Sequence, residues 1–73
     1  MSRSEFHVVP DGGRWKVERG SSAFGTYGTK QEAVDKGREA ARANQPSQLV
    51  LHTADGQIET EYTYQDDPYP PKG

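Results

Sequence analysis

The sequence contains no cysteine. This absence excludes disulfide bonds, a thiol nucleophile and thiolate metal sites, and it is typical of proteins from a reducing compartment. The segment MSRSEFHVVPDGG lacks the apolar stretch of a secretory signal. The longest purely aliphatic run is Leu49-Val50-Leu51, far shorter than the roughly 20 residues that a membrane-spanning helix needs. We therefore expect a cytoplasmic protein with no membrane segment.

Large apolar side chains are also scarce. Leu, Ile, Val and Phe together account for only ten of the 73 residues, which is below the ~20% under which disorder becomes a concern. Disordered chains usually also carry a large net charge, whereas this chain carries −2. We expect a flexible N-terminus at residues 1–5, one folded domain at 6–65 and a proline-rich tail at 66–73. Small domains without cross-links are often stabilised by self-association, which makes a homodimer a candidate state.

A large excess of either charge is lacking as well. Residues 1–54 carry eight basic and six acidic side chains, and residues 55–73 carry one basic and five acidic ones. Neither balance reaches the basic excess of a dedicated nucleic-acid binder. Opposite charges on the two parts favour an approach of two copies, although a mixed, solvated surface is the more common meaning.

The first half of the chain predicts a β-hairpin. EFHVVP and RWKVER flank Asp11-Gly12-Gly13, a turn signal that supplies residues with positive φ. Strand alternation places Trp15 and Val17 on one face, and Phe6 and Val8 on the matching face of the partner strand. The residues between them fall on the opposite face. The following segment GSSAFGTYGT is either a loop or a short third strand at residues 23–27.

A helix is predicted from Thr29 onward. The segment TKQE forms a capping box, in which the Thr hydroxyl accepts the amide hydrogen three residues on. Small apolar residues then recur at helical spacing, and Pro46 prevents continuation. A stripe of small residues lets the helix axis approach a sheet closely. Gly37 costs about 1 kcal/mol relative to Ala within a helix, and close backbone contact is its expected compensation.

A second hairpin follows, with Asp55-Gly56 at its turn. In its last strand Ile58 and Tyr62 are predicted to face the helix, and Pro68 ends the ladder. The expected fold is α+β with the order β-β-(β)-α-β-β, one helix packed on a small antiparallel sheet. The predicted core consists of Phe6, Val8, Trp15, Val17, Ala33, Val34, Gly37, Ala40, Ala41, Leu49, Leu51, Ile58 and Tyr62.

Four segments, HVVPDGGRWKV, TKQEAVDKGREAAR, LVLHTADGQI and DPYPPKG, resemble in this order a small bacterial domain-of-unknown-function family, numbered 2188. The resemblance runs from about His7 to Gly73. It implies that the two histidines, the tryptophan, the capped helix, the Asp-Gly hairpin and the Pro-Pro-Lys-Gly ending are family features. Gly37, Thr53 and Gln65 depart from the family pattern, which affects local turns rather than the fold. The family has no established activity, so the resemblance implies an architecture and no mechanism.

The residues that could carry chemistry form no catalytic pattern. His7 and His52 fall in predicted strands and could share a proton or a metal, but zinc normally needs three or four protein ligands. Strand histidines more often bond to neighbours or line an interface. The serines lie in no nucleophile motif, and Glu59, Glu61 and Asp66-Asp67 lie in exposed sequence. We expect no enzyme activity, no catalytic residue, no metal and no cofactor.

Binding is the function that remains. Because few apolar side chains exist to bury both faces of a sheet, the face opposite the helix is expected to meet a second copy or another protein. The candidate residues of this face are His7, Val9, Arg14, Lys16, Val50 and His52. The alternative is nucleic-acid binding, in which Arg14 and Lys16 on one exposed strand enter a groove.

The tail raises a separate expectation. Its prolines favour polyproline II, a conformation that loses little entropy on docking. The tail either trails into solvent or lies across a sheet face of its own subunit or of a second copy. The candidate docking residues are Pro68, Tyr69, Pro70 and Pro71.

Overall fold

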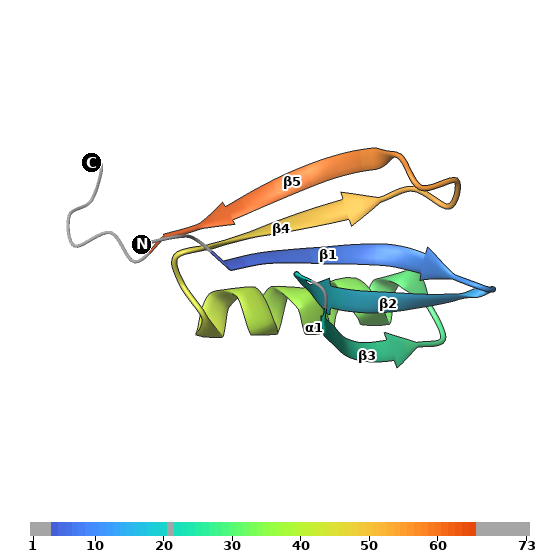
Figure 1. Cartoon of the computed structure of the whole chain (residues 1–73), viewed down its shortest axis with the longest axis horizontal. Helices are drawn as coiled ribbons and strands as arrows, with labels where there is room; N and C mark the ends of the chain where they lie inside the picture. The colour runs from blue at the N-terminus through green and yellow to red at the C-terminus, as the bar shows by residue number, and fades with distance from the viewer. Residues whose placement is uncertain (1–3, 21, 66–73) are drawn as a thin grey trace.

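The computed structural model describes residues 4–20 and 22–65. It contains strands β1 (Ser4–Asp11), β2 (Arg14–Arg19) and β3 (Ser22–Tyr27), helix α1 (Lys30–Ala43), and strands β4 (Ser47–His52) and β5 (Ile58–Tyr64). The five strands form one sheet in the order β3-β2-β1-β4-β5, and α1 packs on one of its faces (Figure 1). The α+β prediction is confirmed, and the segment that was either loop or strand is β3.

The sheet is mixed rather than antiparallel. The pairs β1–β2, β2–β3 and β4–β5 are antiparallel, whereas β1 and β4 run parallel. The expectation of an antiparallel sheet was wrong at this one pair, because α1 carries the chain from the β3 edge back to the free side of β1. A parallel neighbour needs such a crossover connection. The consequence is that β1 becomes the central strand.

The first hairpin follows its turn signal. Gly12 and Gly13 adopt φ values of +56° and +86°, which a residue without Cβ reaches at low cost. The register then pairs Asp11 with Arg14 and Val8 with Val17. Strand β1 begins at Ser4, two residues before the predicted start of the domain.

The helix begins as predicted. Thr29 Oγ1 accepts a hydrogen bond of 3.2 Å from the Glu32 amide. Gly37 is buried in the middle of α1, and a Cβ added there would lie 3.0 Å from Leu49 Cδ1 and 3.2 Å from Val8 Cγ2. The close contact expected to compensate Gly37 is therefore present. The helix packs on β1, β2 and β4 and reaches β3, while β5 lies at the edge of the sheet away from it (Figure 1).

The core lies between α1 and the three central strands. Its fully or almost fully buried members are Phe6, Val8, Val17, Ala33, Ala41, Leu49 and Leu51. Trp15, Tyr27, Val34, Ala40 and Tyr64 pack against them and are partly buried. Ser47 is also buried, and its hydroxyl donates to the carbonyl of Ala41 at the end of α1.

Two residues predicted in the core are exposed: Ile58 at 59% and Tyr62 at 40%. Leu51 pairs with Thr60, but His52 pairs with Ile58, so the register shifts by one residue. This irregularity turns Ile58 to the face of His52, away from the helix. Tyr62 does lie on the helix side, but α1 does not extend over β5, and it remains only partly covered.

We call the sheet face opposite α1 the open face. Among the described residues it is formed by Glu5, His7, Val9, Asp11, Arg14, Lys16, Glu18, Ala23, Thr26, Gln48, Val50, His52, Ile58, Glu61 and Thr63. No secondary-structure element of the described residues packs on it. In the same part of the chain, no helix is long and apolar enough to cross a membrane.

Candidate interaction surface around a histidine pair

The fold brings His7 and His52 together at the middle of the open face. Strand β1 pairs with β4 in parallel, and His7 lies beside Val50. His52 is two residues after Val50 on the same strand, so its side chain lies on the same face of the sheet. His7 Nδ1 lies 2.9 Å from His52 Nε2. The ring centroids are 5.1 Å apart and the ring planes are inclined by 31°. We refer to these two residues as the histidine pair.

Both outer nitrogens of the histidine pair also have partners. His7 Nε2 lies 3.0 Å from Glu5 Oε1, and His52 Nδ1 lies 3.2 Å from the carbonyl oxygen of Gly56. The Gly56 carbonyl and the Glu5 carboxylate oxygen accept hydrogen bonds, so His52 Nδ1 and His7 Nε2 are the donors at the two ends of the chain Glu5–His7–His52–Gly56. Between them, a hydrogen bond joins His7 Nδ1 and His52 Nε2, and either nitrogen can be its donor.

The histidine pair is arranged as a hydrogen bond between two ring nitrogens. The two facing nitrogens point at each other at hydrogen-bond distance, and Glu5 contacts the opposite nitrogen of His7. A metal ion instead needs several lone pairs directed at one point. In residues 4–20 and 22–65, no group of three His, Cys, Asp or Glu side chains is placed to hold a metal ion.

The turn between β4 and β5 positions the carbonyl of Gly56. Thr53 and Gln57 are joined by a backbone hydrogen bond of 2.7 Å, and the Gly56 amide donates to the Thr53 carbonyl at 2.9 Å. Gly56 adopts φ +92°, the left-handed region that favours glycine. The Thr53 hydroxyl donates to Asp55, and this bond lowers the pKa of the exposed Asp55 carboxyl from its ordinary value of 3.8. The Asp55-Gly56 turn therefore places the Gly56 carbonyl where it accepts a hydrogen bond from His52.

Other polar side chains of the open face pair with one another. Lys16 Nζ lies 3.2 Å from Glu18 Oε2, and Gln48 Nε2 donates to Glu61 Oε1 at 2.9 Å. Val50 is only 3% exposed although it lies on this face. The open face is therefore a surface of paired polar groups over a small apolar base.

All six residues predicted for this surface lie on the open face. They come from β1, β2 and β4, with Arg14 exposed beside the β1–β2 turn. Sequence reasoning did not identify Glu5 and the Gly56 carbonyl as partners of the histidine pair. The two-residue spacing from Glu5 to His7, which places both on one strand face, was the available signal. The predicted docking residues Pro68, Tyr69, Pro70 and Pro71 lie outside the described residues.

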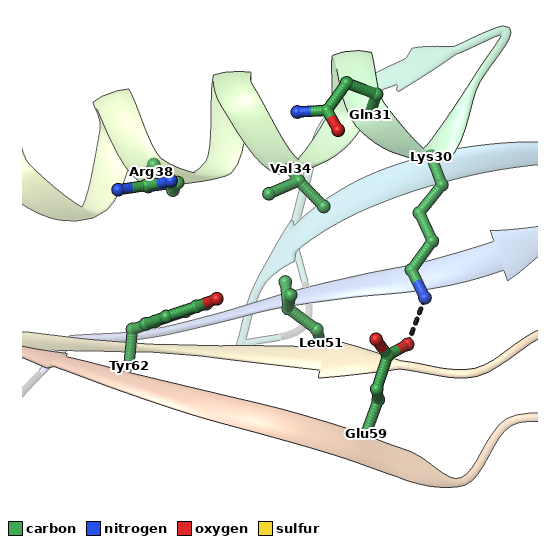
Figure 2. A pocket seen from close by; sticks show the side chains of 7 residues that line it. All are labelled: Lys30, Gln31, Val34, Arg38, Leu51, Glu59 and Tyr62. Carbon is green, nitrogen blue, oxygen red and sulfur yellow. Dashed lines mark hydrogen bonds and ion pairs between the residues drawn. The ribbon is translucent and has the colours of Figure 1, made fainter.

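A recess lies between α1 and β5, on the other side of the sheet from the open face. Its volume is about 370 Å³ and its lining residues are Lys30, Gln31, Val34, Arg38, Leu51, Glu59 and Tyr62. Figure 2 shows Val34 of the helix and Leu51 of β4 facing one another across it. Lys30 forms an ion pair with Glu59 at one end, and the Arg38 guanidinium lies 5.6 Å from the Tyr62 ring centroid at the other. We call this recess the α1–β5 groove.

Together, the five-stranded mixed sheet and its single helix define a small α+β domain. Residues 6–64 match the model of a family described as "Uncharacterized protein conserved in bacteria (DUF2188)", and the chain belongs to this family. The match ends before the Pro-Pro-Lys-Gly segment. No curated protein and no solved structure matches the chain.

Proposed function

We propose that the domain is a non-enzymatic, cytoplasmic interaction module that binds a second copy of itself through the open face. The observation that supports this most is the position of His7. It lies in the middle of β1, which is the central strand of the sheet. Any face-to-face contact of two such sheets is therefore centred on the histidine pair.

The charges of the open face suit a second copy. Arg14 and Lys16 lie towards the β1–β2 turn, and Glu5 lies near the opposite end of β1. In an isologous contact with the two β1 strands antiparallel, Arg14 and Lys16 of each copy lie over the end of β1 that carries Glu5 in the other copy, while Asp11 and Glu18 accompany the two cations within their own copy. Charge complementarity of this kind fixes orientation and increases the association rate.

The pairing of polar groups also supports the proposal. An interface that removes water from an unpaired charge incurs a large penalty. On the open face, Lys16 already has Glu18 and His7 already has Glu5. The rim can therefore be covered without leaving these groups unsatisfied, while Val9 contributes apolar contact at the centre.

The test is sedimentation of the full chain over a wide concentration range. We expect a dimer at high concentration. Lys16→Glu and Arg14→Glu are each expected to raise the dissociation constant of the dimer at least tenfold. Arg42→Glu makes the same charge change on the exposed side of α1 and is the matched control. A chain that stays monomeric at millimolar concentration, or variants that behave like the control, would contradict the proposal.

Nucleic-acid binding through Arg14 and Lys16 is the alternative. Arg14 favours it because its guanidinium forms no ion pair within the described residues. The Lys16–Glu18 pair weakens it by placing a carboxylate beside the second cation. Gel retardation at low salt, where phosphate contacts are strongest, separates the two: retardation that Arg14→Ala abolishes would support nucleic-acid binding.

A further inference from the structure

Strand β5 leaves large apolar side chains uncovered on both of its faces. Ile58 is 59% exposed on the open face, and Tyr62 is 40% exposed on the helix side. β5 is also an edge strand, since it pairs only with β4 among the described strands. A contact on either face would cover one of these side chains. An element that lies beside β5 in the plane of the sheet would cover both.

The α1–β5 groove provides a receptor for such an element on the helix side. Leu51, Val34 and Tyr62 give it apolar surface, and the links Lys30–Glu59 and Arg38–Tyr62 limit it at its two ends (Figure 2). A strand added beside β5 would direct every second side chain towards this groove.

The charge of β5 defines the chemistry of its partner. The strand carries Glu59 and Glu61 and no basic residue. Glu59 is paired with Lys30, whereas Glu61 is exposed on the open face and, among the described residues, accepts a hydrogen bond only from the neutral amide of Gln48. Pairing of β5 with a second copy of β5 would bring acidic strands together, and like charges on neighbouring strands are destabilising. A strand with cationic side chains has the opposite effect.

We propose that β5 binds an extended, cationic segment of a partner protein by strand addition. In this segment apolar side chains alternate with lysine or arginine. The apolar side chains lie on the helix side, at the β5 margin of the α1–β5 groove, where they cover Tyr62. The cations lie on the open-face side, where they pair with Glu61 and their aliphatic stems cover Ile58. Backbone hydrogen bonds along β5 supply affinity, and the groove and Glu61 supply specificity.

The other edge of the sheet lacks these features. Strand β3 contains no charged residue, its register shifts between Val17 and Glu18 of β2, and Phe24 is its single large exposed apolar side chain. Phe24 already packs edge-on against Phe6, with ring centroids 5.4 Å apart. The geometry therefore assigns strand addition to β5.

The probe is a capped seven-residue peptide of alternating lysine and valine, and its control alternates glutamate and valine. Each peptide is titrated into the ¹⁵N-labelled full chain. We expect the lysine peptide to shift the amide resonances of β5 and of Val34, and to slow hydrogen exchange along β5. We expect the glutamate peptide to bind at least tenfold more weakly. No binding of the lysine peptide at millimolar concentration, or equal binding of both peptides, would overturn the proposal.

Two variants locate the site. Glu61→Lys is expected to reverse the preference, so that the glutamate peptide binds more tightly. Glu39→Lys makes the same charge change on the exposed side of α1 and is expected to leave the preference unchanged. Shifts confined to His7 and its neighbours would instead assign the peptide to the open face and overturn strand addition. Peptide binding tests strand addition at β5, and sedimentation tests self-association through the open face. Either proposal can therefore fail while the other stands.

Discussion

The imidazole rings of His7 and His52, 45 residues apart in the sequence, share a hydrogen bond of 2.9 Å at the centre of the open face. The bond joins β1 to the end of β4, just before the turn that leads into β5. It links two segments that the backbone ladder already pairs in parallel, and it continues to Glu5 on one side and to Gly56 on the other. The histidine pair is therefore a connected element of the surface and not two independent side chains.

The first prediction concerns the tautomer of His52. Free neutral imidazole can carry its proton on either nitrogen, but the Gly56 carbonyl requires a donor at Nδ1. We expect neutral His52 to be the Nδ1–H tautomer, with Nε2 unprotonated. Long-range ¹H–¹⁵N correlation spectra distinguish the two forms. An Nε2–H tautomer would contradict a hydrogen bond from His52 Nδ1 to the Gly56 carbonyl.

The second prediction concerns the coupling between the two histidines. His52→Phe keeps a ring of similar shape but leaves His7 Nδ1 and the Gly56 carbonyl without their hydrogen-bond partner. We expect it to lower the free energy of unfolding by about 1 kcal/mol. The double variant His7→Phe/His52→Phe should lose less than the sum of the single losses, by about 0.5–1 kcal/mol. Urea denaturation measures all four proteins, and strictly additive losses would show that the bond contributes nothing.

The third prediction concerns Asp55. The Thr53 hydroxyl bond lowers the pKa of this carboxyl below 3.8 in the folded protein. A lowered folded-state pKa means that ionised Asp55 stabilises the turn above the unfolded value of about 3.8, and that this contribution is lost as the pH falls through the folded-state pKa. Thr53→Val should return the Asp55 pKa towards 3.8. Carboxyl ¹³C shifts followed during an acid titration measure it, and an unchanged titration in the variant would contradict this cause.

The fourth prediction concerns Gly37. Alanine gains about 1 kcal/mol of helix propensity over glycine, but its Cβ would approach the buried Leu49 Cδ1 to 3.0 Å. Overpacking a tight core costs about 1–3 kcal/mol. We expect Gly37→Ala to lower the free energy of unfolding by up to about 2 kcal/mol and Gly37→Val, with its larger side chain, to lower it by more than Gly37→Ala does. Lys36→Ala on the exposed side is the control, and a Gly37→Ala protein that is more stable by the full 1 kcal/mol would disprove close packing here.

Local signals predicted the elements well. The Thr29 cap, the small-residue stripe and the two glycine-containing turns each act over a few residues, and they located α1 and both hairpins. The face shared by His7 and His52 also followed from strand alternation alone. Sequence reasoning therefore placed the six candidate residues on one sheet face, but it did not predict the hydrogen bonds between side chains there.

The errors arose where a distant partner decides the structure. The parallel pairing of β1 with β4 depends on where α1 returns the chain, and no local pattern encodes that. The register shift at His52 depends on how the turn at Gly56 closes, and it moved Ile58 to the opposite face. Tyr62 has the alternation of a core residue, but its exposure is set by the position of α1 above the neighbouring strands. The sequence predicts which side chains share a face of a strand, whereas their burial depends on where the helix packs on the sheet.

The most direct test of the central claim is an isotope-filtered NOE experiment on a mixture of ¹³C-labelled and unlabelled chains. We expect intermolecular NOEs between the Val9 methyl groups of one copy and open-face protons around the histidine pair of the other. Intermolecular NOEs that arise only from Phe24 or Tyr62, or their complete absence at millimolar concentration, would contradict self-association through the open face.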